Sequence, residues 1–193
     1  VLAKQIGRMV KDSKSDTLGS LFAAQWLGFG LLGNRIRLDP IDNPWCTDSL
    51  MQSMRDESAL FFVSLVRDNR PIEDLIHAPY TFMNEELSRE IYGMDSVRGA
   101  KMRQVPLNDP RRAGILTHGS LMAITSNYKE TSPIKRGNWI LETLLGKPLP
   151  PPPPNAGAFS EVLENDDSLT FQEKVELHSK RASCKSCHSK IDP

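Results

Sequence analysis

The stretch TDSLMQSMRDESALFFVSLVRDN, residues 47–69, decides the fold class that the sequence predicts. Thr47 or Asp48 can cap a helix here, because a short side chain can accept the amide hydrogens that a first helical turn leaves unpaired. The apolar side chains then recur at intervals of three and four, as on one face of a helix; they are Met51, Met54, Phe61, Phe62, Leu65 and Val66. The pattern predicts an amphipathic helix that runs to about Asn69.

The segments on either side also favour helices and loops. Leu18 to Leu32 places apolar and aromatic residues at helical spacing and predicts a buried helix, and the two prolines between Asp39 and Pro44 predict a loop. Asn84 and Gly93 frame a further helix, since asparagine caps a start and glycine a stop.

Three more helical segments are expected nearer the C-terminus. They are a short apolar helix or turn at 114–125, a helix at 134–145, and a last helix that opens with the capping box Thr170-Phe171-Gln172-Glu173. The prolines between 148 and 154 predict an extended polyproline strap. Because no segment of any length has the period of a strand, we predict an all-α fold of irregular helical domains with long loops.

The polar, proline-broken stretch from Gly93 to Arg112 is the candidate domain boundary, which gives domains at 1–107 and 108–193. Lysine plus arginine and aspartate plus glutamate number 24 each, so the formal net charge is zero. The net charge therefore does not favour nucleic-acid binding. No apolar run approaches the roughly 18 residues that span a bilayer. Both ends look cut, and we expect an interior piece of a larger protein.

The C-terminal segment Cys184-Lys185-Ser186-Cys187-His188 has the spacing of a c-type haem-attachment site. Two thiols one helical turn apart can form thioether bonds with the two vinyl groups of a haem, and the imidazole that follows can bind the iron. We therefore predict one covalent haem c, held through Cys184 and Cys187, with His188 as the proximal ligand.

Two other interpretations of the CxxC pair are weaker. A structural zinc ion wants four ligands, and the chain offers only one further cysteine, Cys46, so histidines would have to complete the set. A thioredoxin-like pair sits at the start of a helix after a strand, a setting that the sequence does not suggest. Cys46 itself is expected to be a small buried side chain.

The distal side of the iron is left open by the sequence. His178 lies on an inward stripe of the last helix, and His118 shares a helical face with Ile115 and Met122, so either histidine is a possible distal ligand. A lone histidine on an apolar face is more often a core residue, and the methionines 94, 102 and 122 are weaker candidates because methionine commonly fills cores.

Lys135 and Arg136 carry two positive charges near a helix start, where the helix dipole does not favour them. They are candidates for pairing with the haem propionates, and the alternative is a solvated face.

Two sets of segments carry a family resemblance. The first comprises residues 22–27, 57–62 and 80–85, and the second comprises residues 114–121, 125–127 and 131–142, the proline run and residues 184–193. Together they resemble the large planctomycete-type multidomain cytochrome c proteins, which carry the domains of unknown function DUF1592 and DUF1588. The resemblance implies an exported, haem-bearing protein with further domains on both sides, and a haem-related role for His178. It supplies no substrate.

Three functions follow from these features as hypotheses. The first is an electron-transfer module whose partner is a redox protein or a neighbouring domain of the full-length chain. The second is a haem enzyme, or the electron-accepting domain of an oxidoreductase, and the third is a structural or surface-assembly haem protein. Thioether attachment occurs outside the cytoplasm, so a periplasmic or cell-surface location is expected.

Overall fold

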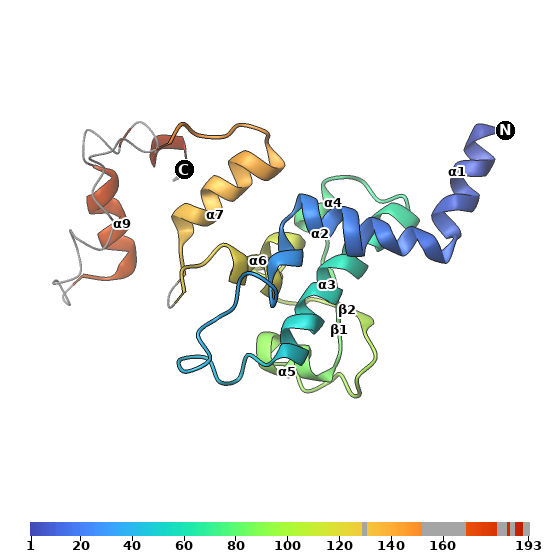
Figure 1. Cartoon of the computed structure of the whole chain (residues 1–193), viewed down its shortest axis with the longest axis horizontal. Coiled ribbons are helices and arrows are strands. Elements are labelled where there is room, and N and C mark those ends of the chain that lie inside the picture. Colours follow the sequence, from blue (N-terminus) through green and yellow to red (C-terminus); the bar gives the residue numbers. More distant parts are fainter. Residues whose placement is uncertain (129–130, 152–168, 181–184, 186–187, 191–193) are drawn as a thin grey trace. The chain divides into compact units, whose positions relative to one another are not determined.

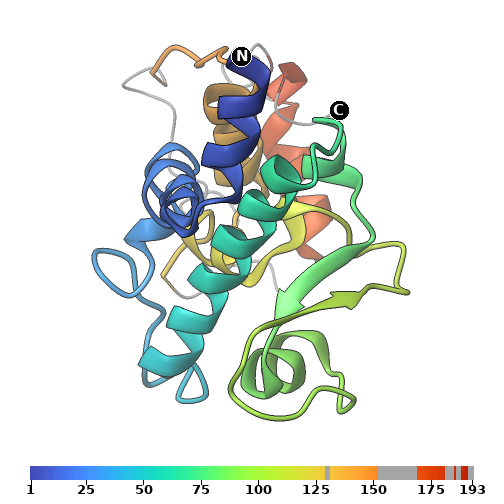
Figure 2. The same cartoon turned by 90° about the vertical axis from the view of Figure 1, so that its right-hand side faces the viewer.

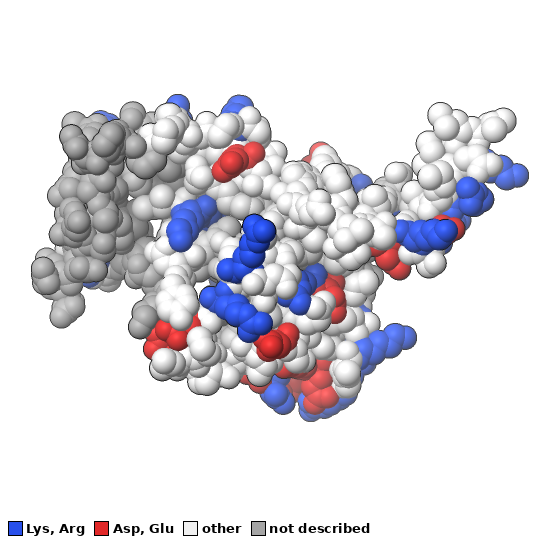
Figure 3. Space-filling model, viewed as in Figure 1, with Lys and Arg blue, Asp and Glu red and all other residues white. Residues whose placement is uncertain are grey.

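The computed structural model describes residues 1–128, 131–151, 169–180, 185 and 188–190 (Figure 1). The chain divides into two compact units, Val1–Ser132 and Pro133–Pro193, called unit 1 and unit 2 below. The predicted boundary between residues 107 and 108 falls inside unit 1, and as a division of the sequence it stays a prediction. Both signs of charge occur over the face seen in Figure 3.

Helix α3 (Asp48–Arg67) runs through the middle of unit 1 (Figures 1 and 2). Its first turn is capped as predicted, because the backbone amide of Leu50 donates to Thr47 Oγ1 at 3.0 Å. The helix ends at Arg67, and Asn69 adopts a left-handed φ of 47° just beyond it. The amphipathic helix is thus confirmed, but its buried face also holds the polar residues Ser53, Glu57 and Ser58.

The N-terminal segments of unit 1 are short and irregular. In chain order they are α1 (Leu2–Lys11), the 3-10 turn η1 (Ser13–Asp16), the π-helical turn η2 (Leu18–Ala23), α2 (Ala24–Trp26) and the 3-10 turn η3 (Phe29–Leu31). Gly28, with a φ of 79°, interrupts the single helix that was expected between Leu18 and Leu32. The side chains of Phe22 and Trp26 are 55% and 40% exposed, so this segment is less buried than expected.

The all-α prediction is wrong, because unit 1 contains a two-stranded antiparallel sheet. Strand β1 (Tyr80–Met83) pairs with β2 (Arg103–Pro106), in a register that sets Tyr80 opposite Pro106 and Met83 opposite Arg103. Each strand has only four residues, and β1 buries three of its four side chains, so neither shows the alternation by which a strand is recognised. The fold is therefore mixed and irregular, with substantial helix.

Two more helical elements flank strand β1 in sequence. Helix α4 (Asp74–His77) precedes β1, and α5 (Glu85–Tyr92) follows it. The predicted frame of α5 is confirmed, since the Leu87 amide donates to Asn84 Oδ1 at 2.9 Å and Gly93 ends the helix with a φ of 63°. Buried apolar side chains from α3, β1 and α5 form the core of unit 1; they include Leu50, Met51, Met54, Met83 and Leu87.

The 3-10 turn η4 (Ile115–Thr117) and helix α6 (Gly119–Ile124) complete unit 1. Ile115 and Leu121 are almost fully buried, and α6 packs against α3. Gly114 precedes η4 with a φ of 56°, and a Cβ at this position would lie 2.4 Å from the backbone carbonyl of Ile76. The chain can enter η4 this closely only because residue 114 is glycine.

In unit 2, α7 (Pro133–Trp139) continues into the π-helical turn η5 (Ile140–Leu144), and Gly146 follows with a φ of 60°. Helix α9 (Phe171–Ser179) begins with the predicted capping box, because the Thr170 amide donates to Glu173 Oε2 at 2.8 Å and the Glu173 amide to Thr170 Oγ1 at 3.3 Å. Residues 148–151 of the predicted proline strap have neither helix nor strand, as expected, and residues 152–154 lie outside the described residues. Within the described ranges, no helix is both long and apolar enough to cross a membrane.

Candidate functional site

The predicted haem-attachment segment is only partly within the described residues. Cys184 and Cys187 lie outside them, whereas His188 lies in a helical turn and is only 7% exposed. The imidazole borders a cavity of about 270 Å³, which is also lined by Ser179, Lys180 and Lys185. A buried imidazole beside two exposed lysines suits a cofactor that combines a metal ion with carboxylates, so the described part of the segment fits a haem c.

The other residues of unit 2 that were predicted to contact the haem are His178, Lys135 and Arg136. His178 lies in α9, but its side chain is outside the description, so its role as distal ligand stays a prediction. Lys135 is exposed and Arg136 half-buried in α7, where burial lowers the pKa of the Arg136 guanidinium. Pairing of these two side chains with haem propionates also stays a prediction.

His118 lies in unit 1, and its ring is fully buried with a hydrogen-bond partner at both nitrogens. Nδ1 lies 3.0 Å from Ser58 Oγ, and Nε2 lies 3.3 Å from Thr81 Oγ1. Burial lowers the pKa of His118 to about 3, so the imidazole is neutral at physiological pH. An iron atom could bind this ring only by displacing one of the hydroxyls, so the geometry favours a structural role.

The helical stripe that singled out His118 is not formed. His118 has extended backbone angles and is the cap residue between η4 and α6, so Ile115 and Met122 do not continue its face. Ile115 is fully buried, and Met122 is 38% exposed.

Cys46 is half-buried against the core of unit 1, less than expected for a small core residue. Burial raises the pKa of its thiol, and the carboxylates of Asp48 and Glu86 add to this effect. A thiol kept protonated in this way is a weak nucleophile and a weak metal ligand. Among the described residues, no group of three or more histidine, cysteine, aspartate or glutamate side chains could hold a metal ion.

The polar neighbours of His118 form a buried cluster that sequence analysis did not find. Its members lie in unit 1 and hydrogen-bond to one another, and all are buried except Tyr92, which is partly buried; they are Glu57, Ser58, Thr81, Tyr92, His118 and Ser120, called the Glu57 cluster. Glu57 is at its centre, since Thr81 Oγ1 donates to Glu57 Oε1 at 2.6 Å and the Tyr92 hydroxyl donates to the same oxygen.

Glu57 Oε2 has no hydrogen-bond partner among the described residues. Burial raises the pKa of Glu57 to about 7, although the bonds from Thr81 and Tyr92, the nearby Gly119 amide and the Arg112 guanidinium all favour the ionised form. Burial also raises the pKa of Tyr92, and the neighbouring Glu57 adds to it. The signal for Glu57 was present in the sequence, because it falls on the helical row between Met54 and Phe61, where a carboxylate is out of place.

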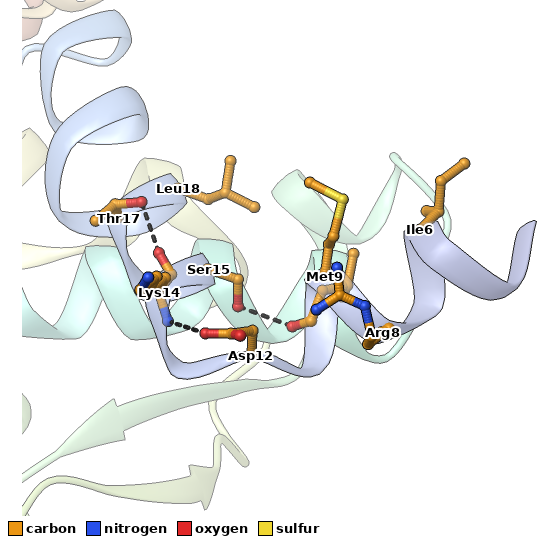
Figure 4. A pocket seen from close by; sticks show the side chains of 9 residues that line it. Ile6, Arg8, Met9, Asp12, Lys14, Ser15, Thr17 and Leu18 are labelled. Carbon is orange, nitrogen blue, oxygen red and sulfur yellow. Dashed lines mark hydrogen bonds between the residues drawn. The ribbon is translucent and has the colours of Figure 1, made fainter. Parts of the chain in front are cut away.

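Two cavities of unit 1 have other linings, although one of them includes Tyr92 of the Glu57 cluster. One, of about 740 Å³, is bordered by Tyr92, Met94, Arg112 and Met122, with the Arg112 guanidinium 5.1 Å from the centre of the Tyr92 ring. The other, of about 540 Å³, lies between α1 and the start of η2 (Figure 4). Hydrogen bonds of Asp12, Ser15 and Thr17 to the backbone shape the turn that borders it.

Comparison with known proteins assigns both halves of the chain. Residues 1–94 match the family model PSD4, described as a protein of unknown function (DUF1592), and residues 112–193 match PSCyt3, described as a protein of unknown function (DUF1588). No curated protein and no solved structure matches the chain. The resemblance drawn from the sequence is confirmed for these two domains, and neither match tests haem binding. The chain therefore contains a DUF1592 domain at residues 1–94, followed after a gap of unmatched residues by a DUF1588 domain at residues 112–193.

Proposed function

We propose that this chain is a c-type haem-binding electron-transfer module of a larger exported redox protein. The observation that carries the proposal is the motif Cys184-Lys185-Ser186-Cys187-His188, in a chain whose only other cysteine is the half-buried Cys46. Two thiols and an adjacent imidazole are the donor set by which a haem c is attached and ligated. The arrangement of these residues in sequence has few other uses.

The described residues of unit 2 support this assignment of roles. Cys184 and Cys187 would supply the thioether bonds, and His188 the proximal nitrogen, which is already held in a buried position beside a cavity. The ammonium groups of Lys180 and Lys185 would border the cofactor and offset the charge of its propionates. Lys135 and Arg136 would add to this in the same unit.

A bound haem c would supply an iron that accepts and releases single electrons. The chain's own contribution would be the burial of His188, which limits water near the ligated nitrogen and thereby helps to set the potential. A cavity of about 270 Å³ is small for a cofactor site, so it would accommodate one edge of a haem and leave the rest to other surroundings. An edge open to a partner suits electron transfer. The partner would be a redox protein or a neighbouring domain.

The experiment is to express the whole chain behind an export signal in cells that have the haem-maturation machinery. The purified protein should carry the mass of one haem after denaturation, and the Cys184→Ala/Cys187→Ala double variant should carry none. Cys46→Ala is the matched control, because it removes the third thiol and should leave the haem in place. If the unaltered protein matures without added mass, the proposal fails.

Optical spectra of the same samples separate electron transfer from enzyme chemistry. A six-coordinate low-spin spectrum that carbon monoxide and peroxide leave unchanged would support electron transfer, and an open high-spin site would contradict it. The distal ligand is identified with two histidine variants. His178→Ala is expected to change the spectrum, whereas His118→Ala is expected to leave the spectrum unchanged and to lower stability, because both nitrogens of His118 are already bonded within unit 1.

A further inference from the structure

The Glu57 cluster links segments that are far apart in the sequence. Glu57 and Ser58 belong to α3, Thr81 to β1 and Tyr92 to α5, while His118 and Ser120 belong to the start of α6. The first four residues lie in the DUF1592 match and the last two in the DUF1588 match. The cluster therefore joins the two family segments inside unit 1.

The hydrogens of the cluster can be assigned from its contacts. Thr81 has a single hydroxyl hydrogen, which it donates to Glu57 Oε1 at 2.6 Å, so its oxygen must accept at the 3.3 Å contact with His118. His118 therefore carries its hydrogen on Nε2. Because this imidazole is neutral, Nδ1 has no hydrogen and accepts from Ser58 Oγ at 3.0 Å.

The assignment then extends to the second serine. Ser58 donates its one hydrogen to His118 at 3.0 Å in preference to the Met54 carbonyl at 3.5 Å, so it accepts from Ser120 Oγ at 2.7 Å. All donors thus point one way along the chain of hydrogen bonds, from Ser120 through Ser58, His118 and Thr81 to Glu57. The chain ends on an oxygen, Oε1, that also accepts from Tyr92.

The second carboxyl oxygen of Glu57 takes no part in this chain of hydrogen bonds. Oε2 of Glu57 is buried and has no partner among the described residues, so an ionised carboxylate would leave a partly unsolvated charge in the core. A proton on Oε2 removes that charge and leaves both bonds at Oε1 intact. The geometry thus favours the neutral acid, with its proton on Oε2.

We propose that Glu57 is a proton switch of unit 1: the protonated acid holds the segment of His118 and Ser120 against α3 and β1, and loss of the proton weakens that attachment. The groups that face Glu57 from the packed elements are Thr81 of β1, Tyr92 of α5, the Gly119 amide of α6 and the Arg112 guanidinium. Arg112 is the only cation among these named groups. It is already engaged with the carbonyl oxygens of Ile91 and Thr117 and with the Tyr92 ring.

The sign of the pH dependence follows from linkage. Burial raises the pKa of Glu57 from 4.5 to about 7, so between these values the folded protein holds a proton that the unfolded chain has lost. The stability contributed by this proton is fully present below about pH 4.5 and is lost as pH rises through about 7. His118 contributes with the opposite sign, because its pKa is lowered from 6.5 to about 3 and the unfolded chain therefore takes up a proton there below about pH 6.5 that the folded protein does not.

The test is urea unfolding of the whole chain and of Glu57→Gln between about pH 5 and about pH 8. Because His118 opposes Glu57, linkage predicts that the unfolding equilibrium constant of the unaltered chain, divided by that of Glu57→Gln, rises on the order of 100-fold over this range. Trp139→Phe serves as the background, so that the fluorescence of Trp26 and Trp45 reports on unit 1. Glu57→Gln keeps the shape without the ionisation, so its own unfolding equilibrium constant should fall roughly 30-fold over this range through His118, whereas that of the unaltered chain should change little. Glu73→Gln, at an exposed position, is the matched control and should show the pH dependence of the unaltered chain.

A direct readout keeps the proposal testable if Glu57→Gln fails to fold. Infrared difference spectra of the unaltered chain should show the band of a buried protonated carboxyl that disappears as pH rises through neutrality. Nitrogen-15 NMR should show His118 in the Nε2–H form at both ends of the range. An unchanged pH dependence in Glu57→Gln, a carboxylate already ionised at about pH 5, or a titrating His118 would each overturn the proposal.

Discussion

Gly19 gives the sharpest test of the packing of η2 against α3. A Cβ built on this residue would lie 2.3 Å from the backbone oxygen of Ala59 and 2.8 Å from Val63 Cγ2. A side chain can rotate away from such a contact, but a backbone carbonyl inside α3 can move only with the helix. We therefore expect Gly19→Ala to force η2 and α3 apart.

The magnitude follows from two opposing effects. Overpacking of a core costs about 1–3 kcal/mol, and a backbone partner places this contact at the upper end of that range. Alanine stabilises a helix by about 0.5–1 kcal/mol relative to glycine, which offsets part of this cost. The free energy of unfolding should therefore fall by about 2 kcal/mol. Urea unfolding followed by far-UV circular dichroism measures this difference.

The matched control is Gly7→Ala in the middle of α1. No heavy atom lies within 4 Å of a Cβ at Gly7, so the substitution keeps the propensity gain without the contact. It should leave stability unchanged or raise it slightly. If Gly19→Ala proves as stable as the unaltered chain, or changes stability in the same direction as Gly7→Ala, then η2 does not pack on α3 as described.

Two further substitutions test local features of unit 1. Gly114→Ala should destabilise the protein by more than 2 kcal/mol, because a Cβ there would meet the Ile76 carbonyl at 2.4 Å; thermal unfolding should show a much smaller loss for Gly93→Ala, whose positive φ is similar but whose surroundings are open. Asn84→Ala should cost about 2 kcal/mol in chemical unfolding, because it removes both the cap of α5 and a buried bond to Ser53 Oγ; a loss below about 0.5 kcal/mol would contradict this account.

The helices that could be predicted are those whose signals are local. Thr47 and Asn84 cap α3 and α5 through bonds that span three residues, and the glycine after α5 is needed by the backbone itself. The strands β1 and β2 could not be predicted in the same way. Each is four residues long, and they pair across the whole of α5, so only tertiary packing determines that they form.

The candidate sites differ in the same respect. The predicted haem-attachment residues, Cys184, Cys187 and His188, are close together in sequence, so the motif can be recognised from the sequence alone. The Glu57 cluster depends on the approach of α3, β1, α5 and α6, and only the misplaced polarity of Glu57 on an apolar helix face hinted at it. His118 was singled out for a helical stripe that does not exist, because the residue is a cap with extended backbone angles.

The position of η4 and α6 has a consequence for how these two families can be inherited. The DUF1588 match begins at residue 112, yet its first part, through α6, is built into the same compact unit as the DUF1592 match. A gene that lost or exchanged either family segment would leave buried serine, histidine or glutamate groups of the Glu57 cluster without their hydrogen-bond partners. Recombination at that boundary would therefore be selected against, and the two segments should travel between genomes as one piece.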